Sequence, residues 1–506
     1  MRPKLPLALL VPFGAMAAAL GFGAWTGFPV HSDAVLTLLE RERGKAALAA
    51  YHPDRPLYGW MLQLTENVAG SGRVVQVGTA LAAWAVLAWL TSLLWKRLFP
   101  GEERWSWLPA LLVLSPIVVQ VQFVGLTIAY PGVLPVSLIL GALLIDLPAP
   151  GVRRPARAAA VLLLAGLSAV ISEYGVAAAF GGAALALVMH HRRTAALLAL
   201  GAGAGAVVFH LISDAAARPD ITAATQLPHV LGHPLRAFGR WLLGFWYALA
   251  GAYGDAASRL LLDPDSRSTL VAFALGLASV PFVVMAVRRF APPDPRAFDR
   301  RRAVGLIVAI GAATLPVVLA GRHVASYGTG IPGYETRFLL PALPFACVLV
   351  ASALVRLLVP GVLPAAAAVL VFLCVQHAWQ GAFEMRRVQS WARDLGRVLQ
   401  PLVRKSPGIT LAVVAADPSP MTGPILTSKI TLGWPAGDAA RTWVLSLDKA
   451  LLLVGSRGRC HVGESISIAG EIRWAGRSGP LDRVVWIPDR GGRVGEPEPY
   501  CVAPAP

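Results

Sequence analysis

Charged side chains are scarce in this sequence. Only 14% of its 506 residues are Asp, Glu, Lys or Arg, whereas soluble domains carry about a quarter. Hydrophobic residues make up 56%, the mean hydropathy is +0.60, and the runs 74–94 and 159–171 contain no charged residue. These features exclude an ordinary soluble chain and predict a polytopic α-helical membrane protein.

The signatures of nucleotide and zinc binding are also missing. The sequence has no P-loop, no dinucleotide-binding glycine fingerprint after a predicted strand and no zinc-ligand spacing. The glycine-rich run 201–205 lies inside an apolar segment, where small residues favour close helix packing. No cofactor is therefore predicted, and a divalent metal is left open without a motif that indicates it.

Cysteine is rare, with four residues in the chain. Cys347 and Cys374 lie within apolar spans, which is typical of packing residues. Cys460 and Cys501 lie in the C-terminal region, where they either form a disulfide in an oxidising compartment or stay as two separate thiols. The sequence does not decide between these alternatives.

Acidic residues are outnumbered, with 28 Asp and Glu against 45 Lys and Arg, and the formal net charge is +17. In a soluble protein this excess would indicate nucleic-acid binding. Here the basic residues gather in short segments between apolar runs, as they do in cytoplasmic loops of membrane proteins. We therefore expect the lipid bilayer as a partner and no nucleic acid.

The charge distribution predicts a topology. With Arg2 and Lys4 inside, about eleven spans of roughly 20 residues alternate so that every strongly basic short loop is cytoplasmic. The N-terminus resembles a signal peptide, but without a small-residue cleavage site we expect an uncleaved first helix. The expected spans are about 5–26, 74–95, two within 105–147, two separated by "SEYG", one from 194, 268–287, 303–320, 338–357 and 361–379.

Three parts follow from this topology. Residues 1–379 form the transmembrane domain, with a first external loop at 28–73. Residues 380–406 have an apolar stripe that predicts an amphipathic linker helix, and short β-like runs at 407–506 predict a small extracytoplasmic α/β or β-rich domain. The short apolar element 241–253 is expected in the membrane surface or as a re-entrant segment.

The first external loop carries more chemistry than a connection needs. Asp33, in "HSDA", follows the first span and is either a catalytic carboxylate or one stabilised at a helix start. His52 and Arg55, in "HPDRPLYG", precede a helix with an apolar face at 57, 60, 61, 64 and 68. An arginine at this position is suited either to binding a phosphate or to anchoring the helix to anionic lipid.

Two further polar groups are expected on the outer face. Glu173, in "SEYG", is either a turn residue or a group facing a wet cavity, since exposure to lipid is costly. The segment 321–345 contributes Arg322, His323, Tyr334, Glu335 and Arg337, of which Glu335 and Arg337 can also simply pair with each other. Carboxylates beside cations suit transfer from a lipid-linked phosphosugar, because a base activates the acceptor and cations stabilise the departing phosphate.

On these motifs the chain resembles the GT-C superfamily of integral membrane glycosyltransferases, which includes protein O-mannosyltransferases and aminoarabinose transferases. The resemblance rests on "HSDA", "HPDRPLYG", "SEYG" and "YETRFLLPALP", and its architecture covers most of residues 1–400. It implies a multi-pass protein of the cytoplasmic (inner) membrane, with its active site and C-terminus extracytoplasmic. It also implies sugar transfer from a polyprenyl-phosphate donor to an envelope glycan, lipid or protein.

The resemblance also implies roles for residues. It assigns catalysis to Asp33 and binding of the donor phosphate to Arg337, with Tyr334 nearby. Arg55, Arg322 and His323 are added by position only. Many members of the superfamily have a second acidic residue directly after the first, whereas this sequence has Ala34 there. This departure weakens the prediction of a divalent metal at Asp33. Glu173 is not assigned as a metal ligand.

Two other functions fit the same composition. A transporter or flippase of lipid-linked or anionic solutes would need polar residues deep in several spans and often an internal repeat. An O-antigen ligase or polymerase type of enzyme also uses lipid-linked glycans but matches these motif positions less well. The concentration of polar groups on one face favours the glycosyltransferase prediction.

Overall fold

The computed structural model describes the greater part of the 506-residue chain. The described residues are 7–27, 44–48, 55–70, 72–119, 126–146, 155–213, 223–262, 267–290, 300–320, 334–405, 409–414, 442–446, 450–454, 481–488 and 495–499.

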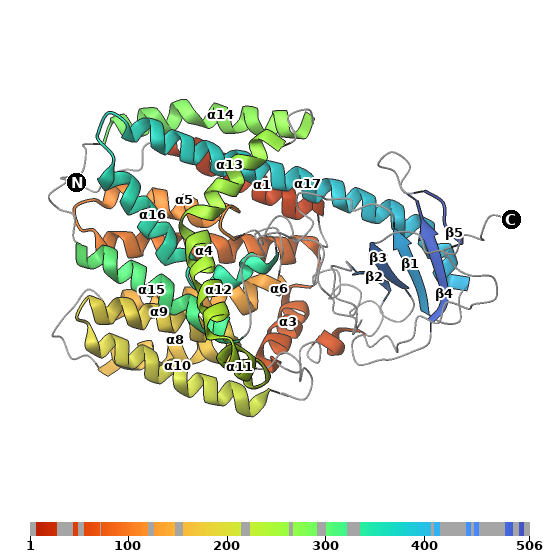
Figure 1. Ribbon diagram of the computed structural model, residues 1–506, viewed down its shortest axis with the longest axis horizontal. Coiled ribbons are helices and arrows are strands. Elements are labelled where there is room, and N and C mark those ends of the chain that lie inside the picture. The colour runs from red at the N-terminus through yellow and green to blue at the C-terminus, as the bar shows by residue number, and fades with distance from the viewer. Residues whose placement is uncertain are drawn as a thin grey trace.

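Helices dominate the described residues and lie side by side in a bundle, with a small sheet beyond one end (Figure 1). The helices of the N-terminal half are η1 (Leu7–Leu9), α1 (Leu10–Gly27), η2 (Lys45–Leu48), α3 (Pro56–Ala69), α4 (Arg73–Leu98), η3 (Glu103–Trp105), α5 (Trp107–Leu114), α6 (Leu126–Ile128), η4 (Ala129–Val133), α7 (Leu134–Asp146), α8 (Pro155–Ile171), α9 (Glu173–Val188) and α10 (Arg192–Ile212). Those that follow are α11 (Ala223–Gly232), α12 (Pro234–Trp246), η7 (Tyr247–Gly251), α13 (Ala252–Leu262), α14 (Arg267–Arg288), α15 (Arg300–Leu319), η9 (Tyr334–Leu339), α16 (Leu343–Leu357) and α17 (Leu363–Lys405).

Among the described residues, seven helices are long and apolar enough to cross a membrane. These spans are Leu7–Thr26, Arg73–Leu98, Ala129–Asp146, Arg192–Ile212, Arg267–Arg288, Arg300–Leu319 and Leu363–Phe383. Three shorter apolar helices, α8, α9 and α16, pack among them. The chain is therefore a multi-pass helical membrane protein, as predicted, although the number of long spans is seven where about eleven were expected.

Part of this difference lies in the first of the two spans expected within 105–147. There the structure has only the short helix α5, whose side chains are almost all buried. Its C-cap, Ser115, is extended (φ −76°, ψ 132°) and precedes Pro116. A residue before proline is driven out of the helical region, so the apolar run cannot continue as one straight span.

The basic segments meet at one end of the bundle. Arg356, at the end of α16, forms an ion pair of 2.8 Å with Glu102, which follows α4. Arg301, at the start of α15, donates a hydrogen bond of 2.6 Å to the carbonyl of Val188, at the end of α9. We call this the basic end; it includes Lys96, Arg97, Arg301, Arg302 and Arg356. Segments far apart in the sequence therefore share one end, as the alternating charge pattern requires.

The segment α11 to α13 crosses the bundle rather than running along it (Figure 1). Its α12 contacts α15, and the indole N–H of Trp241 donates a hydrogen bond of 3.0 Å to the carbonyl of Gly311. Tyr247 and Ala248 of η7 are buried, and α13 contacts α17. The element expected at 241–253 is thus part of a transverse segment of three helices, whose polar residues at 255 and 258 make it unsuitable as a further span.

The glycines of the run 201–205 divide by face. A Cβ on Gly205 would lie 2.2 Å from the carbonyl oxygen of Gly166, and one on Gly201 would lie 2.7 Å from that of Leu162. Around Gly203 nothing lies within 4 Å. The expected close helix packing is confirmed, because α10 meets α8 through its glycines at 201 and 205.

The C-terminal part begins with α17, which continues from the last span without interruption through the predicted linker helix. The strands β1 (Ile409–Val414), β2 (Thr442–Ser446), β3 (Ala450–Val454), β4 (Leu481–Ile487) and β5 (Glu498–Pro499) form a sheet of order β2-β3-β1-β4-β5. The strands β3, β1 and β4 are parallel, and both edge strands are antiparallel. Strands β1 to β4 overlap β-like runs of the sequence at 409–416, 442–447, 450–456 and 483–489.

Candidate functional site

Helix α3 is amphipathic, but its apolar face points outward. Trp60, Leu64 and Val68 are exposed, whereas Tyr58 and Glu66 are buried. A soluble protein would bury the apolar face, whereas a helix beside a bilayer exposes it to lipid. The predicted helix is confirmed, beginning with Pro56 at its first position, and its polar face is turned toward the bundle.

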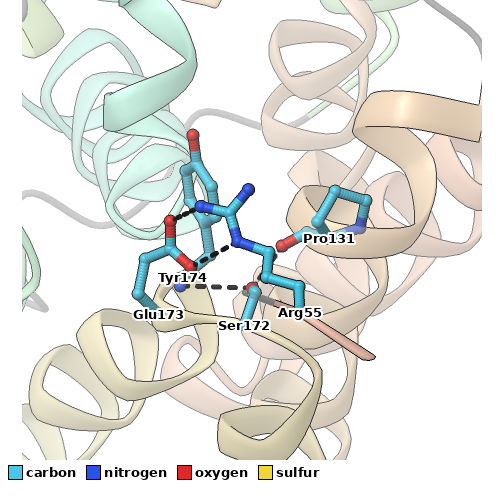
Figure 2. A network of polar contacts seen from close by, with 5 residues as sticks. All are labelled: Arg55, Pro131, Ser172, Glu173 and Tyr174. Carbon is cyan, nitrogen blue, oxygen red and sulfur yellow. Dashed lines mark hydrogen bonds and ion pairs between the residues drawn. The ribbon is translucent and has the colours of Figure 1, made fainter. Parts of the chain in front are cut away.

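The N-cap residue of α3 reaches a distant part of the chain. The guanidinium of Arg55 binds the carboxylate of Glu173 through two hydrogen bonds, with Nε donating to Oε2 at 3.0 Å and Nη2 donating to Oε1 (Figure 2). The Arg55 side chain is 22% exposed and that of Glu173 is 52% exposed. This pair joins the start of α3 to the start of α9, and such bidentate pairs are strong and geometrically defined.

The backbone that carries Glu173 is held tightly. Ser172 separates α8 from α9, caps α9 by accepting a hydrogen bond from the Tyr174 N–H at 3.3 Å, and donates its hydroxyl hydrogen to the Pro131 carbonyl (Figure 2). A Cβ on Gly175 would lie only 2.2 Å from the Ser168 carbonyl oxygen. The close approach of α8 and α9 therefore depends on glycine at this position, and it fixes the first turn of α9.

A second arginine is tied to the same turn. The ring of Tyr174 stacks on that of Phe338, with centroids 6.3 Å apart and an interplanar angle of 11°. The Arg337 guanidinium lies 4.4 Å from the centroid of the Phe338 ring, on the helical turn η9. Arg55 is bound to the first turn of α9 directly through Glu173, whereas Arg337 is linked to the same turn through the rings of Phe338 and Tyr174.

The inward face of α3 makes two further polar contacts. Lys45 of η2 forms an ion pair of 3.0 Å with Glu66, whose side chain is only 5% exposed. The hydroxyls of Thr65 and Tyr130 form a hydrogen bond with each other. Together with the pair at Arg55, these contacts make the inward side of α3 polar, although the surrounding bundle is apolar.

These groups lie at the end of the bundle opposite the basic end. Glu173 begins α9, whose last residue, Val188, contacts Arg301 of the basic end. In the same way η9 precedes α16, whose last turn carries Arg356. The structure thus separates the basic end from an end that carries the polar contacts of Arg55, Glu173 and Glu66.

The structure pairs two of the residues singled out from sequence, Arg55 and Glu173, and links a third, Arg337, to the same turn through aromatic rings. Glu173 is the first residue of α9, is half-exposed and has Arg55 as its ionic partner. Tyr334 and Glu335 belong to η9, but their side chains lie outside the described part. Six other candidate residues from the sequence analysis lie outside the described ranges: Asp33, His52, Arg322, His323, Cys460 and Cys501.

Sequence reasoning did not single out several residues that build this site. Ser172, Tyr174 and Phe338 position the arginines, and Glu66 is a buried carboxylate on α3. The position of Glu66 on the polar side of an amphipathic helix was visible, yet only packing shows that this side is buried. The stacking of Tyr174 on Phe338 has no signal in the sequence, because 164 positions separate the two residues (338 minus 174).

Within the described residues, no group of three or more His, Cys, Asp or Glu side chains is arranged to hold a metal ion. No protein-family model matches this chain, and no curated protein matches it. The function is therefore argued from the site.

Proposed function

We propose that this protein is a membrane glycosyltransferase that transfers a sugar from a polyprenyl-phosphate donor to an extracytoplasmic glycan, lipid or protein. The observation that carries the proposal is that Arg55 binds the first turn of α9 directly and that Arg337 is linked to the same turn through Phe338 and Tyr174. Arginine is suited to phosphate because its planar fork donates two parallel hydrogen bonds. A pair of arginines at the polar end of an apolar bundle fits a phosphate that is attached to a lipid.

The orientation of α3 supports a lipid-linked donor. Its exposed face carries Trp60, Leu64 and Val68, which suits a helix lying along the membrane surface. Its inward face carries Arg55 and contacts the polar side chains beneath it. An isoprenoid chain in the bilayer would therefore lie close to Arg55, because α3 alone separates lipid from the polar contacts on its inward side.

In the proposed reaction Asp33 acts as the base. It accepts the proton of an acceptor hydroxyl or amine, whose heteroatom attacks the anomeric carbon of the sugar. The bond from that carbon to the phosphate oxygen breaks, and polyprenyl phosphate leaves with the electron pair. Arg337 and Arg55, with Arg322, His323 and Tyr334 as further donors, stabilise the charge on this phosphate. Attack opposite the leaving group inverts the anomeric configuration.

The proposed topology places the bundle in the cytoplasmic (inner) membrane, with the basic end in the cytoplasm. The site beneath α3 and the C-terminal sheet would then face outward, where lipid-linked sugars meet envelope acceptors. The continuous α17 supports this placement, because it leads from the last span directly to β1. The C-terminal domain would bind the acceptor or cover the site.

The alternative function is a transporter, and the buried polar residues of α17 are the observation that would favour it. Gln376, His377 and Gln380 are buried in the second half of the span Leu363–Phe383, and Gln376 Nε2 donates a hydrogen bond of 2.9 Å to Gln380 Oε1. In other spans, buried hydroxyls such as those of Thr91 and Thr314 bond to carbonyls of their own helix. One polar cluster near a single helix is less than a transport path needs, so the enzyme is favoured.

Replacement of the proposed base tests the function. Asp33→Asn in vesicles that contain the full-length protein should abolish transfer from a polyprenyl-phosphate sugar while the amount of protein is unchanged. The donor and acceptor are identified from the intact masses of envelope lipids, glycans and glycoproteins with and without the gene. Normal turnover by Asp33→Asn, or an envelope unchanged by loss of the gene, would contradict the proposal.

A further inference from the structure

We propose that Glu173 is the resting counter-ion of Arg55 and that the phosphate of the lipid-linked ligand replaces it on the guanidinium. The inference rests on the proposed function, because it takes polyprenyl phosphate as the ligand. It deepens that function by assigning Glu173 a role in controlling access to the phosphate site.

The two anions need the same edge of the guanidinium. Glu173 occupies the edge formed by Nε and Nη2, with one carboxylate oxygen on each nitrogen (Figure 2). A phosphate that binds arginine in a bidentate manner uses two nitrogens of one edge as well. Bidentate binding of phosphate to this edge and the observed ion pair therefore exclude each other.

The main chain at Glu173 cannot withdraw to make room. Ser172 is bound to the Pro131 carbonyl, and Gly175 is packed against the Ser168 carbonyl. Ser168 is itself held, because its hydroxyl donates a hydrogen bond of 2.8 Å to the carbonyl of Pro135. Exchange must therefore occur by rotation of the Glu173 side chain, with the helix itself unchanged.

The side chain of Glu173 is placed for such a rotation. At 52% exposed it already contacts solvent, whereas Arg55 at 22% exposed is held closer to the protein. A carboxylate that turns into water recovers its hydration, so its release costs little. It also remains in the first turn of α9, where the helix dipole stabilises a negative charge. The arginine stays in place while its anionic partner changes.

The second arginine gives the phosphate an advantage over the carboxylate. Arg337 is connected to the same turn through Phe338 and Tyr174. Glu173 engages Arg55 in the structure, whereas a phosphate, with two non-bridging oxygens in a diester and three in a monoester, can accept hydrogen bonds from several donor groups at once. The ion pair thus keeps Arg55 oriented before the donor arrives and gives way to the phosphate.

A binding experiment separates exchange from simple positioning. Full-length wild type, Glu173→Gln, Arg55→Ala and the double variant are reconstituted in lipid nanodiscs and titrated with undecaprenyl phosphate that carries no sugar. Glu173→Gln should bind this lipid about three- to tenfold more tightly, since it removes a competing bidentate carboxylate of a partly exposed pair. Arg55→Ala should weaken binding, and the gain from Glu173→Gln should vanish in the double variant.

A matched control comes from an ion pair elsewhere in the chain. Asp394→Asn removes the carboxylate from the exposed pair with Arg397 on α17 and should leave binding unchanged. If Glu173→Gln binds undecaprenyl phosphate as tightly as wild type or more weakly, the exchange is wrong and the role of Glu173 is to position Arg55. If Glu173→Gln binds undecaprenyl phosphate with unaltered affinity while the protein still transfers sugar in an Asp33-dependent manner, the proposed function stands and the exchange is wrong. Absence of both binding and transfer would remove both.

Discussion

Arg55 and Glu173 lie 118 positions apart in the sequence and form a bidentate ion pair that joins the start of α3 to the start of α9. The pair matters because α3 is a surface helix whereas α9 is buried in the bundle. It attaches α3 to a turn that packs closely against α8 at Gly175. A ligand that displaces Glu173 from Arg55 therefore breaks a contact between α3 and α9.

Arg337 provides the most direct test of phosphate binding. Arg337→Ala should raise the KM for the polyprenyl-phosphate donor about tenfold or more, because a charge-assisted hydrogen bond contributes about 1.5–3 kcal/mol. Arg337→Lys should recover only part of this loss, since lysine lacks the planar fork that also stacks on Phe338. Steady-state kinetics at varied donor concentration measure both effects. Arg397→Ala, at an exposed position of α17, is the control, and an unchanged donor KM in Arg337→Ala would remove the assignment.

The contact of α8 with α10 predicts a contrast between two glycines. Gly205→Ala should destabilise the protein by about 1–3 kcal/mol, because its methyl group would meet the Gly166 carbonyl. Gly203→Ala on the same helix should be neutral or slightly stabilising, since nothing lies near it and alanine favours helix. Thermal unfolding in detergent, followed by loss of the monodisperse chromatographic peak, compares them. Equal stability of the two variants would contradict the close packing of α10 against α8 at Gly205.

The ion pair at the basic end predicts a large effect on stability. Glu102→Gln leaves Arg356, whose side chain is 3% exposed, without its carboxylate, and the free energy of unfolding should fall by about 3–5 kcal/mol. The Arg356 guanidinium also lies 4.3 Å from the Phe99 ring, so it is confined at this position. Glu103→Gln, the exposed neighbouring residue, should change stability by less than about 0.5 kcal/mol. Chemical unfolding in detergent measures both, and similar values for the two variants would refute a buried pair.

The transverse segment predicts a difference between two tryptophans of α12. Trp241→Phe removes the hydrogen bond to the Gly311 carbonyl and should cost about 1 kcal/mol. Trp246→Phe, at an exposed position, should cost less. Limited proteolysis within α11 to α13 reports the loosening directly, because cleavage requires the segment to leave α15. Faster cleavage in Trp246→Phe than in Trp241→Phe would place the wrong face of α12 against the bundle.

Much of the architecture could be predicted from the sequence because lipid imposes simple rules. Apolar runs of about 20 residues become helices, since a helix satisfies all of its backbone hydrogen bonds within one segment in hydrocarbon. Basic loops share one end, and the helix beginning at Pro56 has its apolar face outward, as its periodicity indicates. The β-like runs after 407 overlap strands. Each of these features depends on neighbouring residues in the chain, so local pattern was sufficient.

The tertiary structure decided the features that depend on contacts between distant segments. The partner of Arg55, the stacking of Tyr174 on Phe338 and the burial of Glu66 have no local signal, because each arises where separate helices meet. The shortening of α5 and the crossing of α11 to α13 over the bundle are of the same kind. Composition and periodicity determine that this chain enters a membrane and which residues are polar; packing determines which of those residues face one another, and so where a charged ligand can bind.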